Sequence, residues 1–125
     1  MFLIYSGDTL IGRSALEGGD PPMGVASGTF VPTDAFSSFR SQMLRAKNGD
    51  VKSRVDIKIL SNLSAKTADG FLIVCSSGVE VLEYVEQGET FGIEVFCLGI
   101  EYPTYAELFP HHVQAYKDQF ETPTS

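Results

Sequence analysis

The chain has few basic residues, few cysteines and no long hydrophobic run. Its 125 residues include 9 Lys and Arg against 16 Asp and Glu, which gives a formal net charge of −7. Nucleic-acid binding needs clustered positive charge to neutralise phosphates, and these basic residues are scattered along the chain. A membrane-spanning helix needs about 20 consecutive apolar residues. We therefore expect neither a nucleic-acid partner nor a membrane-spanning segment.

The two cysteines, Cys75 and Cys97, each lie in an apolar run and outside any C-x-x-C or Cys/His ligand spacing. Buried free thiols are the expected state, and pairing across neighbouring strands stays open. The N-terminal apolar run has no basic residue before it and stops at Gly7, unlike a secretory signal. We expect a cytoplasmic protein.

The composition is that of a folded chain. Hydrophobic residues make up 43% and aromatic residues 11%, which is typical of a globular protein and not of a disordered acidic tail. The length and the absence of internal repeats predict one domain spanning residues 1–125.

The N-terminal half predicts a hairpin, a third strand and a helix. Residues 2–6 and 9–16 favour strands and flank the turn Gly7-Asp8. Residues 25–30 predict a third strand. A helix is then expected from Thr33 or Asp34 to the stop signal Asn48-Gly49. Its expected buried stripe consists of Phe36, Phe39, Met43 and Ala46.

The C-terminal half predicts an antiparallel meander followed by helices. Residues 55–59 alternate as in a half-buried strand, residues 61–70 read as a polar connection, and residues 71–75 read as a covered central strand. After a turn at residues 76–78, strands are expected at residues 79–86 and 89–100. Apolar spacing predicts a helix over residues 104–109, a second helix starting at Pro110, and a frayed tail at residues 121–125.

The loop of residues 18–24 is the first candidate binding element. Its centre is Asp20, Pro21, Pro22 and Met23, where two prolines fix the backbone and Met23 offers an adaptable apolar contact. Pre-ordered loops between strands often bind partners, although the same loop could be only a structural corner.

The glutamates of the meander are the second candidate. Glu80, Glu83 and Glu94, with Glu86, Glu89 and Glu101, lie in a part of the chain that has no Lys or Arg between residues 68 and 116. They form a solvated face, a recognition strip for a basic partner, or a catalytic or metal site. We expect a strongly negative face.

The alternative to a protein-binding module is a small enzyme or ligand-binding protein with a site around His111 and His112. Glu107 would share a helix face with His111 if the helix continued through Pro110. Neither a zinc-binding spacing, a G-x-S-x-G elbow nor a phosphate-binding loop is present. The sequence therefore predicts no metal or other cofactor and favours binding over catalysis.

Two strings carry a resemblance. Both resemble motifs in small bacterial proteins of uncharacterised function. The first is GGDPPMGVA (residues 18–26) followed by GTFVP (residues 28–32), and the second is LFPHHVQAY (residues 108–116). Some small acidic bacterial proteins of this size are immunity partners of toxins, and the similarity in size and charge implies an inhibitor or immunity role.

These observations predict an α+β fold: a mostly antiparallel sheet with an N-terminal hairpin, a central helix, a C-terminal meander and a C-terminal helical segment. The expected function is that of a protein-binding module with a basic protein partner. A homodimer is compatible with the sequence, and nothing in the sequence selects it.

Overall fold

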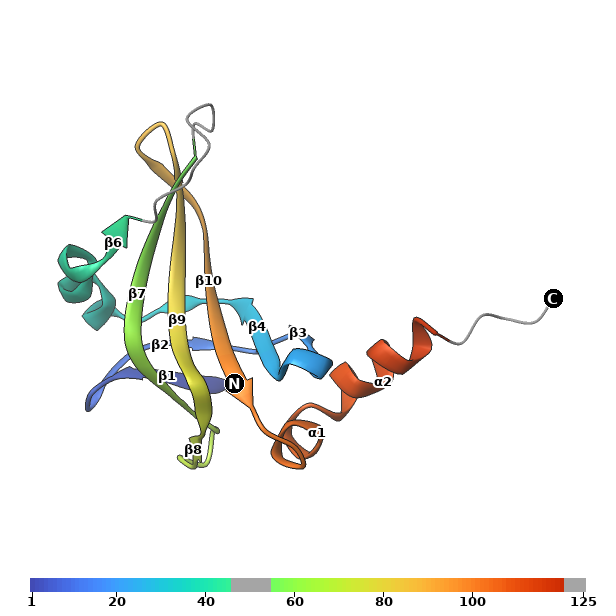
Figure 1. Cartoon of the computed structure of the whole chain (residues 1–125). Helices are drawn as coiled ribbons and strands as arrows, with labels where there is room; N and C mark the ends of the chain where they lie inside the picture. The colour runs from blue at the N-terminus through green and yellow to red at the C-terminus, as the bar shows by residue number, and fades with distance from the viewer. Residues whose placement is uncertain (46–54, 121–125) are drawn as a thin grey trace.

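The computed structural model describes residues 1–45 and 55–120, and most of this part is antiparallel sheet (Figure 1). The strands are β1 (Phe2–Ser6), β2 (Thr9–Ser14), β3 (Gly18–Asp20), β4 (Val25–Thr29), β5 (Val31–Pro32), β6 (Leu44–Arg45), β7 (Val55–Lys66), β8 (Leu72–Ile73), β9 (Cys75–Glu86) and β10 (Glu89–Ile100). The helices are the 3-10 helices η1 (Pro21–Met23) and η2 (Asp34–Gln42) and the α-helices α1 (Thr104–Leu108) and α2 (Pro110–Asp118).

A bend in β7 divides the sheet into two facing layers. The strand order is β3-β4-β10-β9-β7-β1-β2-β5, and β6 and β8 also pair with β7. The register between β7 and β9 shifts between Leu60 and Leu63, and Asn62 in this bulge has a φ of 61°. Asn accepts the left-handed conformation more readily than most residues. Beyond the bulge, β7 pairs with β1, so β1 and β2 lie behind β9 and β10 (Figure 1).

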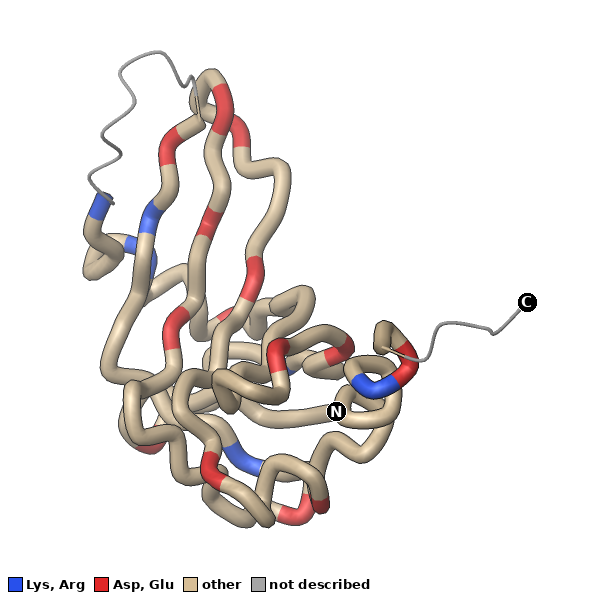
Figure 2. Tube along the Cα trace, turned by 45° about the vertical axis from the view of Figure 1, so that its right-hand side comes forward, with Lys and Arg blue, Asp and Glu red and all other residues tan. Residues whose placement is uncertain are grey.

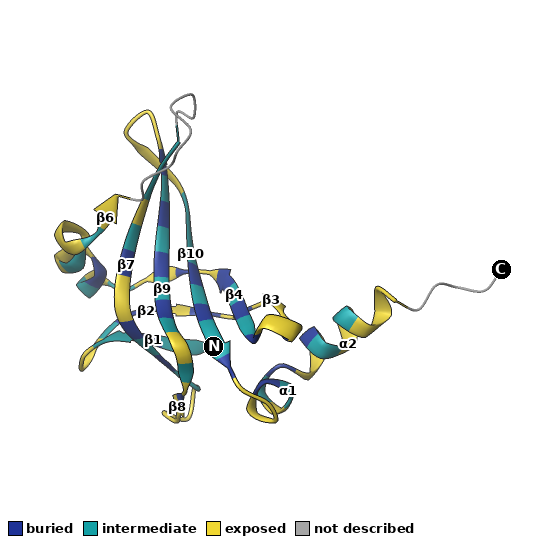
Figure 3. Ribbon diagram, in the orientation of Figure 1, coloured by how far each residue is buried: buried dark blue, intermediate teal, exposed yellow. Residues whose placement is uncertain are grey.

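The core lies between these layers. Side chains alternate along β9, so Val79, Val81 and Val85 point inward and are buried (Figure 3). Phe30 and Phe36 close one end of the core, with their ring centroids 5.1 Å apart. Burial of each large apolar side chain contributes about 1.5–3 kcal/mol, which makes this core the main stabilising feature.

Several expected elements are confirmed. The antiparallel hairpin of β1 and β2, the third strand β4 and the long strands β9 and β10 lie close to their predicted ranges. The C-terminal helices also divide at Pro110 as expected. The expected helical stop at Asn48-Gly49 and the tail at residues 121–125 lie outside the described residues.

The predicted central helix is wrong in type and length. It is the 3-10 helix η2, which ends at Gln42 and is followed by the short strand β6. Thr33 does not cap it, because its hydroxyl donates to the carbonyl oxygen of Leu10 at 2.8 Å. Phe36 is its one buried residue, so little packing energy supports a longer α-helix.

The predictions for residues 61–75 are also wrong. The expected polar connection is largely strand, because β7 continues to Lys66 with its polar residues at and beyond the bulge. The expected central strand is only the short edge strand β8, and Phe71 and Val74 beside it are 72% and 69% exposed. The expected turn at residues 76–78 lies inside β9, where Gly78 has a φ of 92°.

Cys75 and Cys97 are free thiols; Cys97 is buried and Cys75 is half-buried. No helix in residues 1–45 and 55–120 is long and apolar enough to cross a membrane.

Candidate functional site

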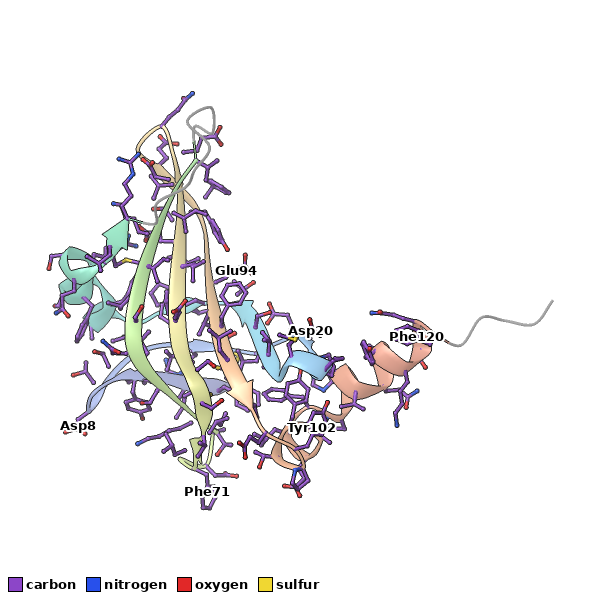
Figure 4. All side chains as sticks on the ribbon, viewed as in Figure 1. Asp8, Asp20, Phe71, Glu94, Tyr102 and Phe120 are labelled. Carbon is purple, nitrogen blue, oxygen red and sulfur yellow. The ribbon has the colours of Figure 1, made fainter. Side chains whose placement is uncertain are left out.

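A groove of about 490 Å³ lies between the edge strand β3 and the helix α2. Its walls are Glu17, Gly18, Gly19, Asp20 and Pro21 on one side and His112, Ala115, Tyr116 and Gln119 on the other. A volume of this size is within the usual range of sites for small ligands or single side chains of a partner. Figure 4 shows Asp20 beside the first turns of α2.

Residues 18–24, which were expected to form an irregular loop, instead have regular secondary structure before and after Asp20. Residues 18–20 form β3, which pairs with β4, and Pro21 begins the 3-10 helix η1. Gly24 ends η1 with a φ of 66°, where its carbonyl oxygen accepts the N–H of Ile100 at 2.9 Å. The Tyr102 hydroxyl donates to the Pro21 oxygen at 3.1 Å. These bonds fix one wall of the groove.

Gly19 allows the helices to pack closely on β3. A Cβ at this position would lie 2.4 Å from the Val25 oxygen, 2.6 Å from the Tyr105 hydroxyl and 3.0 Å from Nδ1 of His112. Only glycine therefore fits here without displacing its neighbours. The adjacent Gly18 has no such constraint, because its nearest neighbour would be 3.6 Å away.

His112 is buried in the groove wall and is held by Tyr105. The Tyr105 hydroxyl donates to the Val25 oxygen at 2.8 Å, so it accepts from Nδ1 of His112 at 3.0 Å. Nδ1 is the ring nitrogen that contacts Tyr105, and Nε2 is buried without a hydrogen-bond partner. The His112 ring also stacks on Phe109, with centroids 4.9 Å apart.

Burial lowers the pKa of His112, and the neighbouring His111 lowers it further. The main-chain oxygens of Leu16 and Glu17 and the Glu17 carboxylate act in the opposite direction but do not prevail. His112 is therefore neutral at pH 7. Burial also raises the pKa of Tyr105 to about 12, so the phenol keeps its proton.

Glu17 is a fixed carboxylate at the mouth of the groove. Its Oε1 accepts the backbone N–H of Thr29 at 2.8 Å, and this bond lowers its pKa. The carboxylate rests against Gly28, where a Cβ would lie 2.2 Å from Oε2. Within residues 1–45 and 55–120, Glu17 and Asp20 form no ion pair. The groove thus presents anionic acceptors without a cation of its own.

The structure separates the residues expected to bind. Asp20 and Pro21 line the groove, together with His112 from the alternative prediction. Pro22 and Met23 do not line it, and Met23 is 69% exposed.

The expected negative face divides between two sides of the sheet. Glu83 points inward, is 2% exposed and pairs with Arg40. Glu80 and Glu94 lie half-buried on the opposite side of β9 and β10. Figure 2 shows acidic positions along these strands and no basic ones.

Sequence reasoning missed Glu17, Tyr116 and Gln119. The residues of β3 and those of α2 that form the groove are distant along the chain, so the sequence does not show that they meet. One signal was available, because a helical spacing places His112, Tyr116 and Gln119 on one face of α2. No group of three or more His, Cys, Asp or Glu side chains in the described parts of the chain could hold a metal ion.

The imidazole of His112 is poorly placed for proton transfer, because Nδ1 is bonded to Tyr105 and Nε2 is buried. General acid–base catalysis needs a group within hydrogen-bond reach of the substrate. His111 is exposed on the helix surface. Neither nitrogen of His112 is therefore free to exchange a proton with a ligand in the groove.

No protein-family model, curated protein or solved structure matches this chain.

Proposed function

We propose that this chain is a protein-binding module that takes a basic side chain of its partner into the groove between β3 and α2. The observation that carries the proposal is the Glu17 carboxylate, which Thr29 holds in place at 2.8 Å and which has no ion-pair partner among the described residues. An acceptor that is already fixed loses little conformational freedom when a cation binds.

The groove favours a guanidinium over other groups. Its acceptors are the carboxylates of Glu17 and Asp20, two of the residues that line it. Arginine brings five N–H donors and binds a carboxylate through two of them. The ring of Tyr116 lines the same groove and provides a surface on which a guanidinium can stack.

The test uses a defined probe, because the partner is unknown. The ¹⁵N-labelled protein is titrated with acetyl-Gly-Gly-Arg-Gly-Gly-amide, and amide shifts are followed by NMR. We expect saturable shifts at Gly18, Gly19 and residues of α2. The same peptide with citrulline in place of arginine keeps the shape but lacks the charge, and it should not bind measurably.

Glu17→Gln removes the fixed charge and should weaken binding about twofold to fivefold, the usual range for an ion pair at an exposed carboxylate. Glu107→Gln changes the net charge equally on the exposed surface of α1, outside the groove, and is the matched control. Equal binding of the citrulline peptide, or equal weakening by both variants, would contradict the proposal.

A further inference from the structure

The second side of the sheet carries apolar side chains, and no helix or strand within residues 1–45 and 55–120 covers it. We define the outer face as the half-buried side chains of β7, β9 and β10 that point away from the core. Its apolar members are Ile57, Ile59, Leu82, Tyr84, Phe96 and Leu98. Directly opposed residues of antiparallel strands share one face. Ile57 is opposite Tyr84, and Ile59 is opposite Leu82.

None of these six side chains packs against the core. In Figures 1 and 3 the outer face lies toward the viewer, and no drawn helix or strand crosses in front of β7, β9 and β10. An antiparallel sheet with one side in water normally carries polar residues on that side. A continuous apolar patch on a folded surface indicates an interaction site.

Two carboxylates lie inside this patch. Glu94 is opposite Leu82 on β9 and Thr29 on β4, and Glu80 is opposite Phe96, so each carboxylate has an apolar neighbour across the strand. Within the described residues neither forms an ion pair. Burial and the nearby Glu94 raise the pKa of Tyr84. The outer face therefore combines apolar side chains with two carboxylates that have no ion-pair partner within residues 1–45 and 55–120.

The negative charge of Glu80 and Glu94 decides which kind of partner fits the outer face. A second copy docked face to face would bring the carboxylates of both copies into one poorly hydrated interface, which is unfavourable. A membrane would have to bury the same carboxylates, and anionic lipids would repel them. A basic amphipathic segment satisfies both features, because its cations would pair with Glu80 and Glu94 while its apolar side chains cover the rest.

We propose that the outer face docks a partner segment in which Lys or Arg side chains stand among apolar ones. The probe is a 14-residue amphipathic helix of Leu and Lys, measured by calorimetry and by NMR shifts. A Leu/Glu peptide and a Lys/Ser peptide of the same length separate the charge from the apolar contact. Only the Leu/Lys peptide should bind with shifts on β7, β9 and β10.

Two double variants test the residues. Glu80→Gln with Glu94→Gln, and Leu82→Thr with Phe96→Thr, should each weaken binding about tenfold or more. The control is Glu86→Gln with Glu89→Gln, which makes the same charge change at the exposed hairpin end. It should leave binding unchanged, and the shifts on β7, β9 and β10 are read separately from those at Gly18, Gly19 and α2 in the groove. This separates a failure here from a failure of the groove.

Three outcomes would overturn the inference. The Leu/Glu peptide could bind as well as the Leu/Lys peptide, which would remove the role of the carboxylates. Sedimentation could reveal a dimer that Leu82→Thr with Phe96→Thr dissociates, which would make a second copy the occupant. The protein could co-sediment with phosphatidylcholine vesicles through the same residues, which would make the occupant a lipid surface. Circular dichroism confirms that each variant is folded.

Discussion

Glu83 and Arg40 form an ion pair that joins the inner side of β9 to the 3-10 helix η2. The Glu83 side chain is 2% exposed and that of Arg40 is 43% exposed, so the pair is half screened from solvent. The Arg40 guanidinium also lies 5.0 Å from the ring centroid of the buried Phe36. A carboxylate on the core side of a sheet is costly unless it is paired. Arg40 therefore compensates a charge that β9 brings inward.

Removing Arg40 should destabilise the protein because Glu83 stays buried without its partner. We expect Arg40→Gln to lower the free energy of unfolding by about 1–3 kcal/mol, as measured by urea denaturation at pH 7. Arg45→Gln is the control, because Arg45 pairs with Asp56 at the surface, where both side chains are exposed. That variant should lose less than about 1 kcal/mol. Equal losses would show that the burial of Glu83 has no energetic consequence.

Gly19 and Gly18 are adjacent and should respond differently to the same substitution. Gly19→Ala places a Cβ against Val25, Tyr105 and His112, and this overpacking should cost about 1–3 kcal/mol. Gly18→Ala meets Ser27 at 3.6 Å, an ordinary contact, and should stay within about 0.5 kcal/mol of the parent. Thermal unfolding of the two variants checks this. A tolerated Gly19→Ala would show that α1 and α2 do not pack on β3 as described.

His112 should make the stability depend on pH below its ordinary pKa of 6.5. Its ordinary pKa is 6.5, and burial lowers it in the folded protein. Between the two values the unfolded chain binds a proton that the folded chain does not, so stability falls as the pH drops. The contribution is complete above pH 6.5, decreases below it and levels off beneath the folded pKa.

The measurement is the urea midpoint between pH 8 and pH 5 for the parent, His112→Gln and His111→Gln. The slope below pH 6.5 should disappear in His112→Gln. It should persist in His111→Gln, although slightly reduced, because His111 contributes to the lowered pKa of His112. An unchanged slope in His112→Gln would assign the dependence to other groups.

The sequence predicted those elements that local features determine. The turn Gly7-Asp8 defined the first hairpin, and Pro110 divided the C-terminal helices. β-Branched residues with flanking glycines predicted β9 and alternation predicted β10, but neither pattern shows which side is covered, so Glu83 was not expected in the core. The bend at Asn62 depends on the pairing of β7 with two different strands, and a local pattern does not contain that information.

The groove was only half predictable for the same reason. Asp20 and Pro21 stood out through their own backbone restrictions. Glu17 resembled any other acidic residue, because its importance comes from the Thr29 N–H and the space over Gly28, which only the folded sheet brings together.

Phe71 and Val74, in the most apolar run of the sequence (residues 71–75), should contribute little to stability, whereas Ile73 between them is 3% exposed and belongs to the core. Phe71 is 72% exposed, and Figure 4 shows it pointing away from the body at the end near β8. Phe71→Ser and Val74→Ser should therefore change the free energy of unfolding by no more than about 0.5 kcal/mol. Ile4→Ala, at a fully buried position of β1, is the comparison and should cost about 2–5 kcal/mol. If these residues formed a covered central strand, the serine variants would lose as much as Ile4→Ala, so urea denaturation of all three decides between the arrangements.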